Sequence, residues 1–266
     1  MAAPDRKRDE TEELAEGTLV SHLIELRQRL VKATVAVAVI LVALLPFQDQ
    51  VWSVVSKPLT DVLPEDSGPI STGVIAPFLT PLKATFYVAL CLAMPVVLYQ
   101  IWKFVAPGLY RREKRFAMPL VVSSILLFYL GVAFAYFVVF GIVFSFIWNT
   151  VPPGVTWFPD INQFLSFALR MCFSFGVAFE IPIATFMLVW SGLVPIATLG
   201  KARPYVFLGA FVVGMLLTPP DAISQTMLAL PMYVLYEGGL ILSRILLRDQ
   251  LRARAAAAES PPDGTG

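Results

Sequence analysis

The sequence predicts an all-α membrane protein with six transmembrane helices, and three observations support this prediction. The chain has 266 residues, of which 57% are hydrophobic and only 15% are charged, whereas a soluble domain is about 45–50% apolar and about 25% charged. The apolar residues form six runs separated by polar loops, and nearly all basic residues lie in alternate loops. These features place the chain in the membrane class before any single residue is considered.

The six runs define the candidate spans, since a helix needs roughly 20 apolar residues to cross a bilayer core of ~30 Å. They are residues 31–47, 78–102, 116–148, 164–190, 205–217 and 223–242. The third run is unusually long. The fifth has about 13 residues, or roughly 20 Å of helix, and the sixth is polar at its start and soon reaches Glu237. We therefore expect a concave bundle with two short C-terminal spans, which thin the bilayer or lie in a recess.

The basic residues predict the orientation of these spans, because cytoplasmic loops are enriched in lysine and arginine. Of the 20 lysine and arginine residues, all but Lys57, Lys83 and Arg170 lie in the N-terminal segment, the second and fourth loops, or the C-terminal tail. Both termini should therefore lie in the cytoplasm.

The chain should form one transmembrane domain, residues 19–243, between two extensions. Residues 1–18 mix acidic and basic side chains without an apolar core, so they predict a flexible charged segment and not a cleavable signal peptide. Residues 244–266 are basic at first and then small, with proline and glycine, which predicts a disordered tail. The long first outside loop, residues 48–77, predicts a structured cap, with a disordered tether as the alternative.

The segment before the first span, residues 20–32, has the periodicity of an amphipathic helix. Arg27 falls within its apolar arc, where a guanidinium needs a carboxylate or phosphate partner. Arg29 and Lys32 fit a solvated polar face. Glu25 lies on that face among basic neighbours, at the cytoplasmic surface, where a positively charged ligand would need an acid.

The second loop repeats this pattern, because Glu113 is its only acid among several basic residues. A pair on a juxtamembrane helix, or local charge balance, would also explain this residue. Together, Glu25 and Glu113 supply two carboxylates on one side of the membrane. Such a pair suits two guanidiniums, since guanidinium binds carboxylate oxygens in bidentate fashion.

Glu180 lies near the middle of the fourth span, where an ionised carboxylate costs a few kcal/mol. It must therefore face the interior, pair with another group, or become protonated. Pro182 cannot bond back to the carbonyl of Ala178, so the helix should kink beside the acid and open it to water or a partner. The alternative to a functional acid is a buried one bonded to a neighbouring helix.

Polar residues gather between the fifth and sixth spans. Asp221 suits the N-cap of the sixth helix, and this interpretation is at least as well supported as a direct functional role. Thr218 and Gln225 flank it, and polar side chains at this depth can hydrogen-bond another membrane helix. They predict either a docking site for a partner's transmembrane segment or mutual pairing within this chain.

The sequence contains no recognisable catalytic set. The only histidine, His22, lies outside the spans, HExxH is absent, and the spans lack paired aspartates. No phosphate loop or dinucleotide fingerprint is present, so we expect no enzyme activity and no cofactor, and energy must come from a partner or the proton gradient. The main alternative function is a secondary transporter with Glu180 as a proton or cation site, although no internal repeat favours it.

Four stretches resemble the TatC family of twin-arginine translocase subunits. They are SHLIELRQRL, FVAPGLYRREKRF, SFGVAFEIPI and RPYVFLGAFVVGMLLTPPDAISQTMLALPMYVLYE. The resemblance covers roughly Leu19 to Ser243, and its motifs are long and in order. It implies a cupped six-helix protein of the bacterial inner membrane that recognises signal peptides bearing two consecutive arginines on folded proteins. It also implies TatA-like and TatB-like single-span partners, membrane lipids, several copies per complex and the proton-motive force, with no nucleic acid.

The resemblance also assigns roles to individual residues. Glu25 and Glu113 match acids that contact the twin arginines, and the resulting signal-peptide site is Glu25, Arg27, Phe104 and Glu113. Glu180 matches an acid linked to partner or signal-peptide engagement. The polar cluster that docks a partner helix matches Met215, Thr218 and Gln225. Pro58 matches a sensitive position in the first outside loop. We therefore expect recognition at the cytoplasmic rim, entry of the apolar signal segment near Glu180, and partner assembly at the last two spans.

Overall fold

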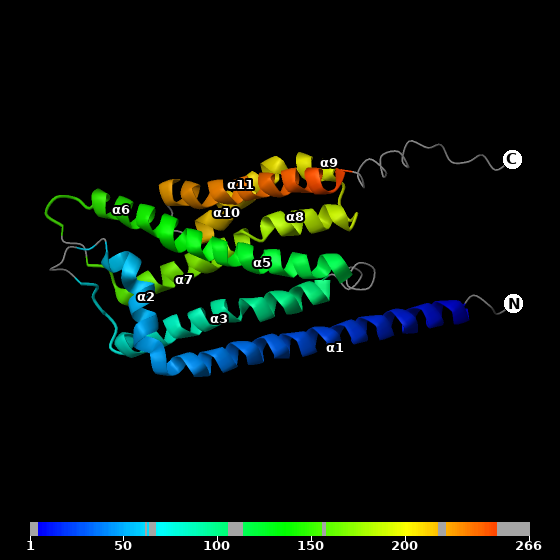
Figure 1. Cartoon of the computed structure of the whole chain (residues 1–266), viewed down its shortest axis with the longest axis horizontal. Coiled ribbons are helices and arrows are strands. Elements are labelled where there is room, and N and C mark those ends of the chain that lie inside the picture. Colours follow the sequence, from blue (N-terminus) through cyan, green and yellow to red (C-terminus); the bar gives the residue numbers. More distant parts are fainter. Residues whose placement is uncertain are drawn as a thin grey trace. The chain divides into compact units, whose positions relative to one another are not determined.

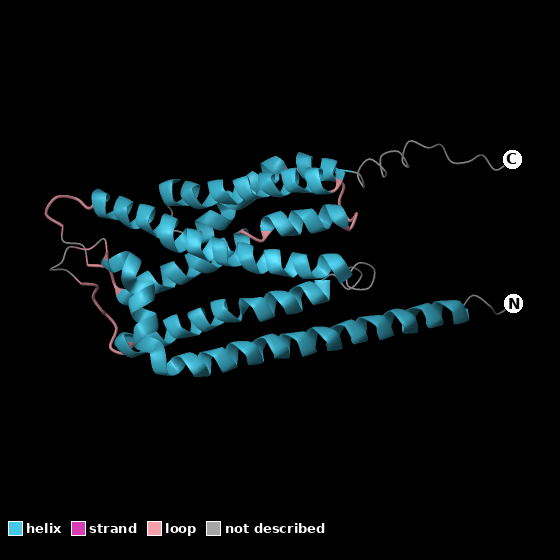
Figure 2. Ribbon diagram, viewed as in Figure 1, coloured by secondary structure: helices cyan, strands magenta, loops and turns pink. Residues whose placement is uncertain are grey.

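The chain is helical in all its long elements (Figures 1 and 2). The computed structural model describes residues 5–61, 63, 68–105, 114–155, 158–217 and 222–248. Within these ranges the only strand-like pairing is one isolated bridge between Ile70 and Asp160. The chain divides into two compact units, which are Met1–Val54 with Pro81–Ile125 and Val55–Thr80 with Leu126–Gly266.

Five helices of the described chain are long and apolar enough to cross a membrane, and a sixth apolar helix is shorter. The long ones are Leu23–Thr60, Ala76–Phe104, Met118–Thr150, Ile161–Trp190 and Gln225–Leu246, and the shorter one is Arg203–Leu216. These helices confirm the six predicted spans and the shortness of the fifth. The cytoplasmic position of the termini and the concave shape stay predictions.

The N-terminal helix α1, Asp5–Leu44, runs for 40 residues and joins the predicted amphipathic segment to the first span. It begins earlier than the sequence predicts, because most residues of the N-terminal extension are good helix formers such as Glu, Lys, Arg, Leu and Ala. A 3-10 turn, η1 (Leu45–Phe47), leads into α2, Gln48–Thr60. None of the side chains described in α1 is buried, so its apolar surface is available to lipid or to another helix.

The second span is α3, Ala76–Val105, which stays helical through two internal prolines, Pro81 and Pro95. The third span extends over 33 residues, from Met118 to Thr150, which confirms its predicted length. It consists of α5 (Lys114–Phe134), a π-helical turn η2 (Ala135–Val139) and α6 (Phe140–Thr150). The π-helical turn adds a residue to the repeat and so changes the face that the helix presents beyond it.

The fourth span is broken into α7, Ile161–Ala178, and α8, Ile181–Trp190, with a turn at Phe179 and Glu180 between them. Pro182 lies in the first turn of α8, where the N–H that it lacks would have no partner within the helix. The break confirms the predicted kink beside Glu180.

The last helices belong to the second unit, and α11 lies alongside α8 and α10 (Figure 1). α9 is Ile196–Lys201, α10 is Arg203–Leu217 with 15 residues, and α11 is Ala222–Leu246 with 25 residues. We therefore correct the expectation of two short C-terminal spans, since only the fifth is short. α11 extends beyond the predicted end at 242, through Ser243 and Arg244 to Leu246. The hydroxyl of Ser243 also donates to the carbonyl of Gly239 at 2.7 Å, within the helix.

The first outside loop is structured in its described part. α2 occupies its first 13 residues. Further along, the N–H of Ile70 donates to the carbonyl of Pro159 at 3.0 Å, and the Ile70 carbonyl accepts from the N–H of Ile161 at 2.9 Å. These bonds tie the loop to the start of α7 within the second unit, and they favour the structured cap over the disordered tether.

Candidate functional site

The predicted acid of the N-terminal helix has an ion-pair partner one turn away. Arg29 contacts the Glu25 carboxylate through both Nε, at 3.1 Å from Oε1, and Nη2. The Glu25 side chain is 42% exposed, whereas that of Arg29 is only 13% exposed. Arg29 is therefore not the solvated charge that the sequence predicts, because spacing of four residues on a helix brings it onto the acid. Arg27 is exposed, and no ion pair to it is present among the described residues.

The end of the second span is fixed by a buried hydrogen bond that sequence reasoning missed. Trp102 Nε1 donates to the hydroxyl of Ser124 on α5 at 2.8 Å, and both residues are buried. Phe104 lies two residues later and is half-buried. Glu113 lies outside the described residues. An indole in an apolar span needs an acceptor, which is the signal that could have identified this pair.

Glu180 occupies the turn between α7 and α8 as the N-cap residue of α8. Its N–H donates to the carbonyl of Val177 at 3.0 Å, and its own carbonyl accepts from the N–H of Ala184 at 2.9 Å. The residue is half-buried, and its Oε1 atom is fully buried. The helix break thus places Glu180 at the N-terminus of α8 inside a span, and its side chain makes no capping hydrogen bond to that helix.

The predicted partner-docking residues differ in their surroundings. Met215 on α10 is 53% exposed. Gln225 on α11 donates its Nε2 to the carbonyl of Phe211 on α10 at 2.8 Å, so the predicted alternative of pairing within the chain holds for its amide N–H. Thr218 and Asp221 lie outside the described residues.

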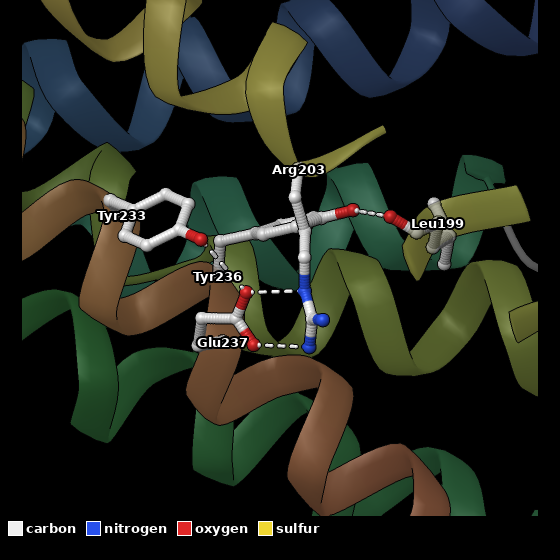
Figure 3. A network of polar contacts seen from close by, with 5 residues as sticks. All are labelled: Leu199, Arg203, Tyr233, Tyr236 and Glu237. Atoms are coloured by element: carbon white, nitrogen blue, oxygen red, sulfur yellow. Dashed lines mark hydrogen bonds and ion pairs between the residues drawn. The ribbon is translucent and has the colours of Figure 1, made fainter. Parts of the chain in front are cut away.

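A network of polar contacts links α9, α10 and α11, and the sequence analysis did not predict it (Figure 3). Arg203 Nη2 donates to Glu237 Oε2 at 2.8 Å, and Arg203 Nε lies 2.6 Å from Oε1. The hydroxyl of Tyr233 donates to Oε1 at 3.1 Å. The hydroxyl of Tyr236 donates to the carbonyl of Leu199 at 2.6 Å. The position of Glu237 inside a span was a signal for a cationic partner, and the antiparallel hairpin supplies Arg203.

A second acid that the sequence analysis did not predict, Asp160, joins the loop at Thr72 to the start of α7. It is the N-cap of α7, accepting from the N–H groups of Asn162 and Gln163 at 3.0 Å each. It also accepts from the Thr72 hydroxyl at 2.6 Å and the Thr72 N–H at 3.0 Å. The Thr72 hydroxyl and then the Gln163 N–H lower the pKa of this carboxyl from 3.8 to about 2. Pro58, the sensitive position of the resemblance, is half-buried inside α2.

The described residues contain no cluster of three or more histidine, cysteine or acidic side chains suited to a metal ion. The functional candidates lie on three features, which are the partly exposed Glu25 of α1, the break in the fourth span at Glu180, and the α10–α11 hairpin joined by Arg203 and Glu237. These features suit binding of basic and helical ligands.

Comparison with known proteins shows which family the chain resembles. The family model for Sec-independent protein translocase protein (TatC) matches residues 21–231. A Sec-independent protein translocase protein TatC of Azotobacter chroococcum mcd 1 is 53% identical over 243 residues, covering 91% of this chain and 94% of the relative. The protein of that name from Escherichia coli strain K12 is 53% identical over 226 residues, covering 85% and 88%. A crystal structure of the twin arginine translocase receptor TatC has a TM-score of 0.76 at 33% identity, covering 84% of this chain and 98% of that one.

Proposed function

Because the chain belongs to the TatC family of Sec-independent protein translocase proteins, we propose that it is the signal-peptide receptor of a twin-arginine translocase. It is a multi-pass membrane protein and a translocase component. The proposal adds that it binds the twin-arginine motif of folded proteins and assembles the complex in the bacterial inner membrane, with both termini in the cytoplasm. The observation that carries it is the exposed Glu25 carboxylate, oriented by Arg29 on a helix that flanks the first span.

The proposed recognition step pairs two carboxylates with two guanidiniums. Glu25 presents a side chain that is 42% exposed, while Arg29 holds one of its oxygens. Glu113 supplies the second carboxylate, and Phe104 lies at the end of the span that leads into the same loop. Because guanidinium forms two parallel hydrogen bonds to a carboxylate and ammonium does not, this arrangement selects arginine over lysine.

The later steps of the proposal involve the second unit. The apolar part of the signal peptide enters near Glu180, at the break in the fourth span. TatB-like and TatA-like single-span helices bind at α10 and α11, and several copies assemble under the proton-motive force. α10 has 15 residues, or about 22 Å of helix, against a bilayer core of about 30 Å. This difference favours local thinning of the membrane at the assembly site.

The test is binding of a twin-arginine signal peptide to the purified full-length protein in lipid nanodiscs. A peptide with both arginines changed to lysine is measured beside it, and the variants are Glu25→Gln and Glu113→Gln. Glu16→Gln is the matched control, since it removes an acid from the same helix outside the proposed site. Each lost charge-assisted bond is worth about 1.5–3 kcal/mol, so affinity should fall roughly 10- to 150-fold.

Equal binding of both peptides, unaffected by Glu25→Gln and Glu113→Gln, would mean that the affinity is only hydrophobic and would refute the receptor proposal. Solute flux through liposomes that contain this protein alone, abolished by Glu180→Gln, would instead favour the secondary transporter.

A further inference from the structure

We propose that Arg203, Tyr233 and Glu237 form a clamp that sets the rotation and register of α10, and so determines which face α10 offers to a single-span partner helix. The inference rests on the proposed docking of such a partner at α10 and α11. It adds that these three residues are positioning residues for that interface, although the partner does not need to touch them.

No large side chain is buried in the part of α10 whose side chains are described. In the part of α10 with described side chains, residues 203–216, only Ala210 and Gly214 are buried. Both are small, so they let α10 approach its neighbours closely, and the ring of Phe207 packs edge-on against Tyr233 of α11 at 5.4 Å between centroids. In a membrane, apolar burial against lipid drives little association between helices, and close packing and hydrogen bonds decide how they are arranged. Polar contacts therefore act together with this packing in fixing the helix.

The clamp holds Arg203 to Glu237 through two nitrogens. Arg203 Nη2 donates to Glu237 Oε2 at 2.8 Å, and Arg203 Nε makes an ion-pair contact with Oε1 at 2.6 Å. A rotation of α10 would carry the guanidinium away from the carboxylate and break both contacts. Tyr233 holds the same carboxylate at 3.1 Å. The pair is partly sheltered, since the side chains of Arg203 and Glu237 are 41% and 25% exposed.

The neighbouring helices support the same arrangement. Tyr236, next to Glu237, holds the Leu199 carbonyl of α9 at 2.6 Å, so the segment that enters α10 is also tied to α11 (Figure 3). Two turns further along α10, Gln225 Nε2 bonds the Phe211 carbonyl at 2.8 Å. A helix that is held at Arg203 and at Phe211 can neither slide nor turn without losing one of these contacts.

The held orientation places four exposed apolar side chains on one side of α10, which we call the stripe. They are Tyr205, Leu208, Val212 and Met215, and Phe207, Val213 and Leu216 of the same helix are exposed as well. At about 100° per residue these four positions fall within an arc of roughly 80°, opposite the buried Ala210 and Gly214. A slip of one residue would turn α10 by about 100°, which would replace these four side chains at the partner with a different set of exposed residues.

The experiment uses the full-length protein reconstituted in nanodiscs with a purified TatB-like single-span subunit. A photo-crosslinking residue is placed in turn at the four stripe positions and at Val206 and Gly209, which lie outside the stripe. Crosslinking is compared among the unaltered clamp, Arg203→Glu, Glu237→Arg, the double reversal and Arg203→Lys. Arg244→Glu reverses an exposed charge of α11 outside the clamp and serves as the matched control. Twin-arginine peptide binding is measured on every variant.

We expect each single reversal to lower crosslinking at the stripe on the order of fivefold or more and to raise it at Val206 or Gly209. The double reversal should restore the original pattern, and Arg203→Lys should give an intermediate one because lysine keeps the charge but has only one nitrogen to contact Glu237. Peptide binding should be unchanged throughout, which separates a change of register from general unfolding.

An unchanged crosslinking pattern in the single reversals would overturn the inference, as would a double reversal that folds and binds peptide without recovering the pattern. Absence of any crosslink in the unaltered protein that still binds peptide would overturn the docking of the partner at α10, and this inference with it.

Discussion

Two adjacent glycines of α11 provide a sharp test of how the fourth and sixth spans meet. A Cβ added at Gly239 would lie 2.8 Å from the Cα of Pro182 and 3.1 Å from the Cβ of Thr185, both on α8. A Cβ added at Gly238 would meet nothing within 4 Å. The two residues belong to the same helix, so Gly238→Ala is a matched control for Gly239→Ala.

The expected magnitudes follow from this difference. Replacing glycine by alanine inside a helix stabilises it by about 1 kcal/mol, and both variants share this gain. At Gly239 the new methyl group meets backbone, which cannot rotate away, and overpacking of this kind costs about 1–3 kcal/mol. Gly239→Ala should therefore be less stable than Gly238→Ala by about 1–3 kcal/mol, which corresponds to roughly 2–12 °C in Tm for a chain of this size.

The assay is thermal unfolding of both variants and the unaltered protein in one detergent, followed by tryptophan fluorescence. Gly238→Ala should melt at or above the unaltered protein, and Gly239→Ala below Gly238→Ala by the stated interval. Because Pro182 lies two residues from Glu180, a displaced α8 should also weaken signal-peptide engagement in Gly239→Ala alone. Equal melting temperatures for the two variants would refute the close α8–α11 approach on which this reasoning depends.

Three further predictions concern other contacts. A Cβ at Gly131 would overlap a backbone carbonyl oxygen of α7, while one at Gly141 would meet nothing within 4 Å. Gly131→Ala should therefore lower Tm relative to Gly141→Ala. The reverse order of Tm would contradict the α5–α7 contact. The pKa of Asp160 is lowered to about 2, so its stabilising contribution is fully present above about pH 4 and is lost as the pH falls toward 2. Asp160→Asn should remove this loss of stability from a profile measured between pH 5 and pH 2. A profile that the substitution leaves unchanged would argue against the Asp160 contacts. Trp102→Phe removes the indole donor to Ser124 and should lower the free energy of unfolding, measured by chemical denaturation, by about 1–2 kcal/mol. Adding Ser124→Ala to this variant should lower it by less than Ser124→Ala does alone. If the two effects were fully additive, the bond would contribute nothing.

The positions of the spans follow from the sequence because hydropathy and length are local properties. The break at Glu180 was predictable for the same reason, since Pro182 lacks the N–H that an unbroken helix would bond to the carbonyl of Ala178. The length of the sixth span was harder to predict, because Glu237 looks like the approach of a membrane boundary. Its charge is instead offset by Arg203 within the hairpin, and the helix continues to Leu246.

The candidate site was only partly predictable, because several of its contacts join residues that are distant in the chain. Glu25 and Gln225 were identified as residue types that needed a partner, but the sequence did not specify Arg29 or the Phe211 carbonyl as that partner. The Asp160–Thr72 contact joins residues that are 88 positions apart, and no local sequence pattern predicts it. The roles of Glu25, Glu113 and Glu180 in signal-peptide binding stay predictions.

The contact between Thr72 and Asp160 also bears on the order in which the protein is made. The two residues are 88 positions apart in the chain, and the whole second and third spans lie between them. At a synthesis rate of about 5–20 residues per second, the first outside loop waits roughly 4–18 s for its partner to emerge. During that interval Ile70 and Thr72 have unpaired backbone groups, and the loop is open to proteases and chaperones. The loop can close only after three spans have been inserted, so its protection from proteolysis in a nascent chain reports correct insertion of that half of the protein.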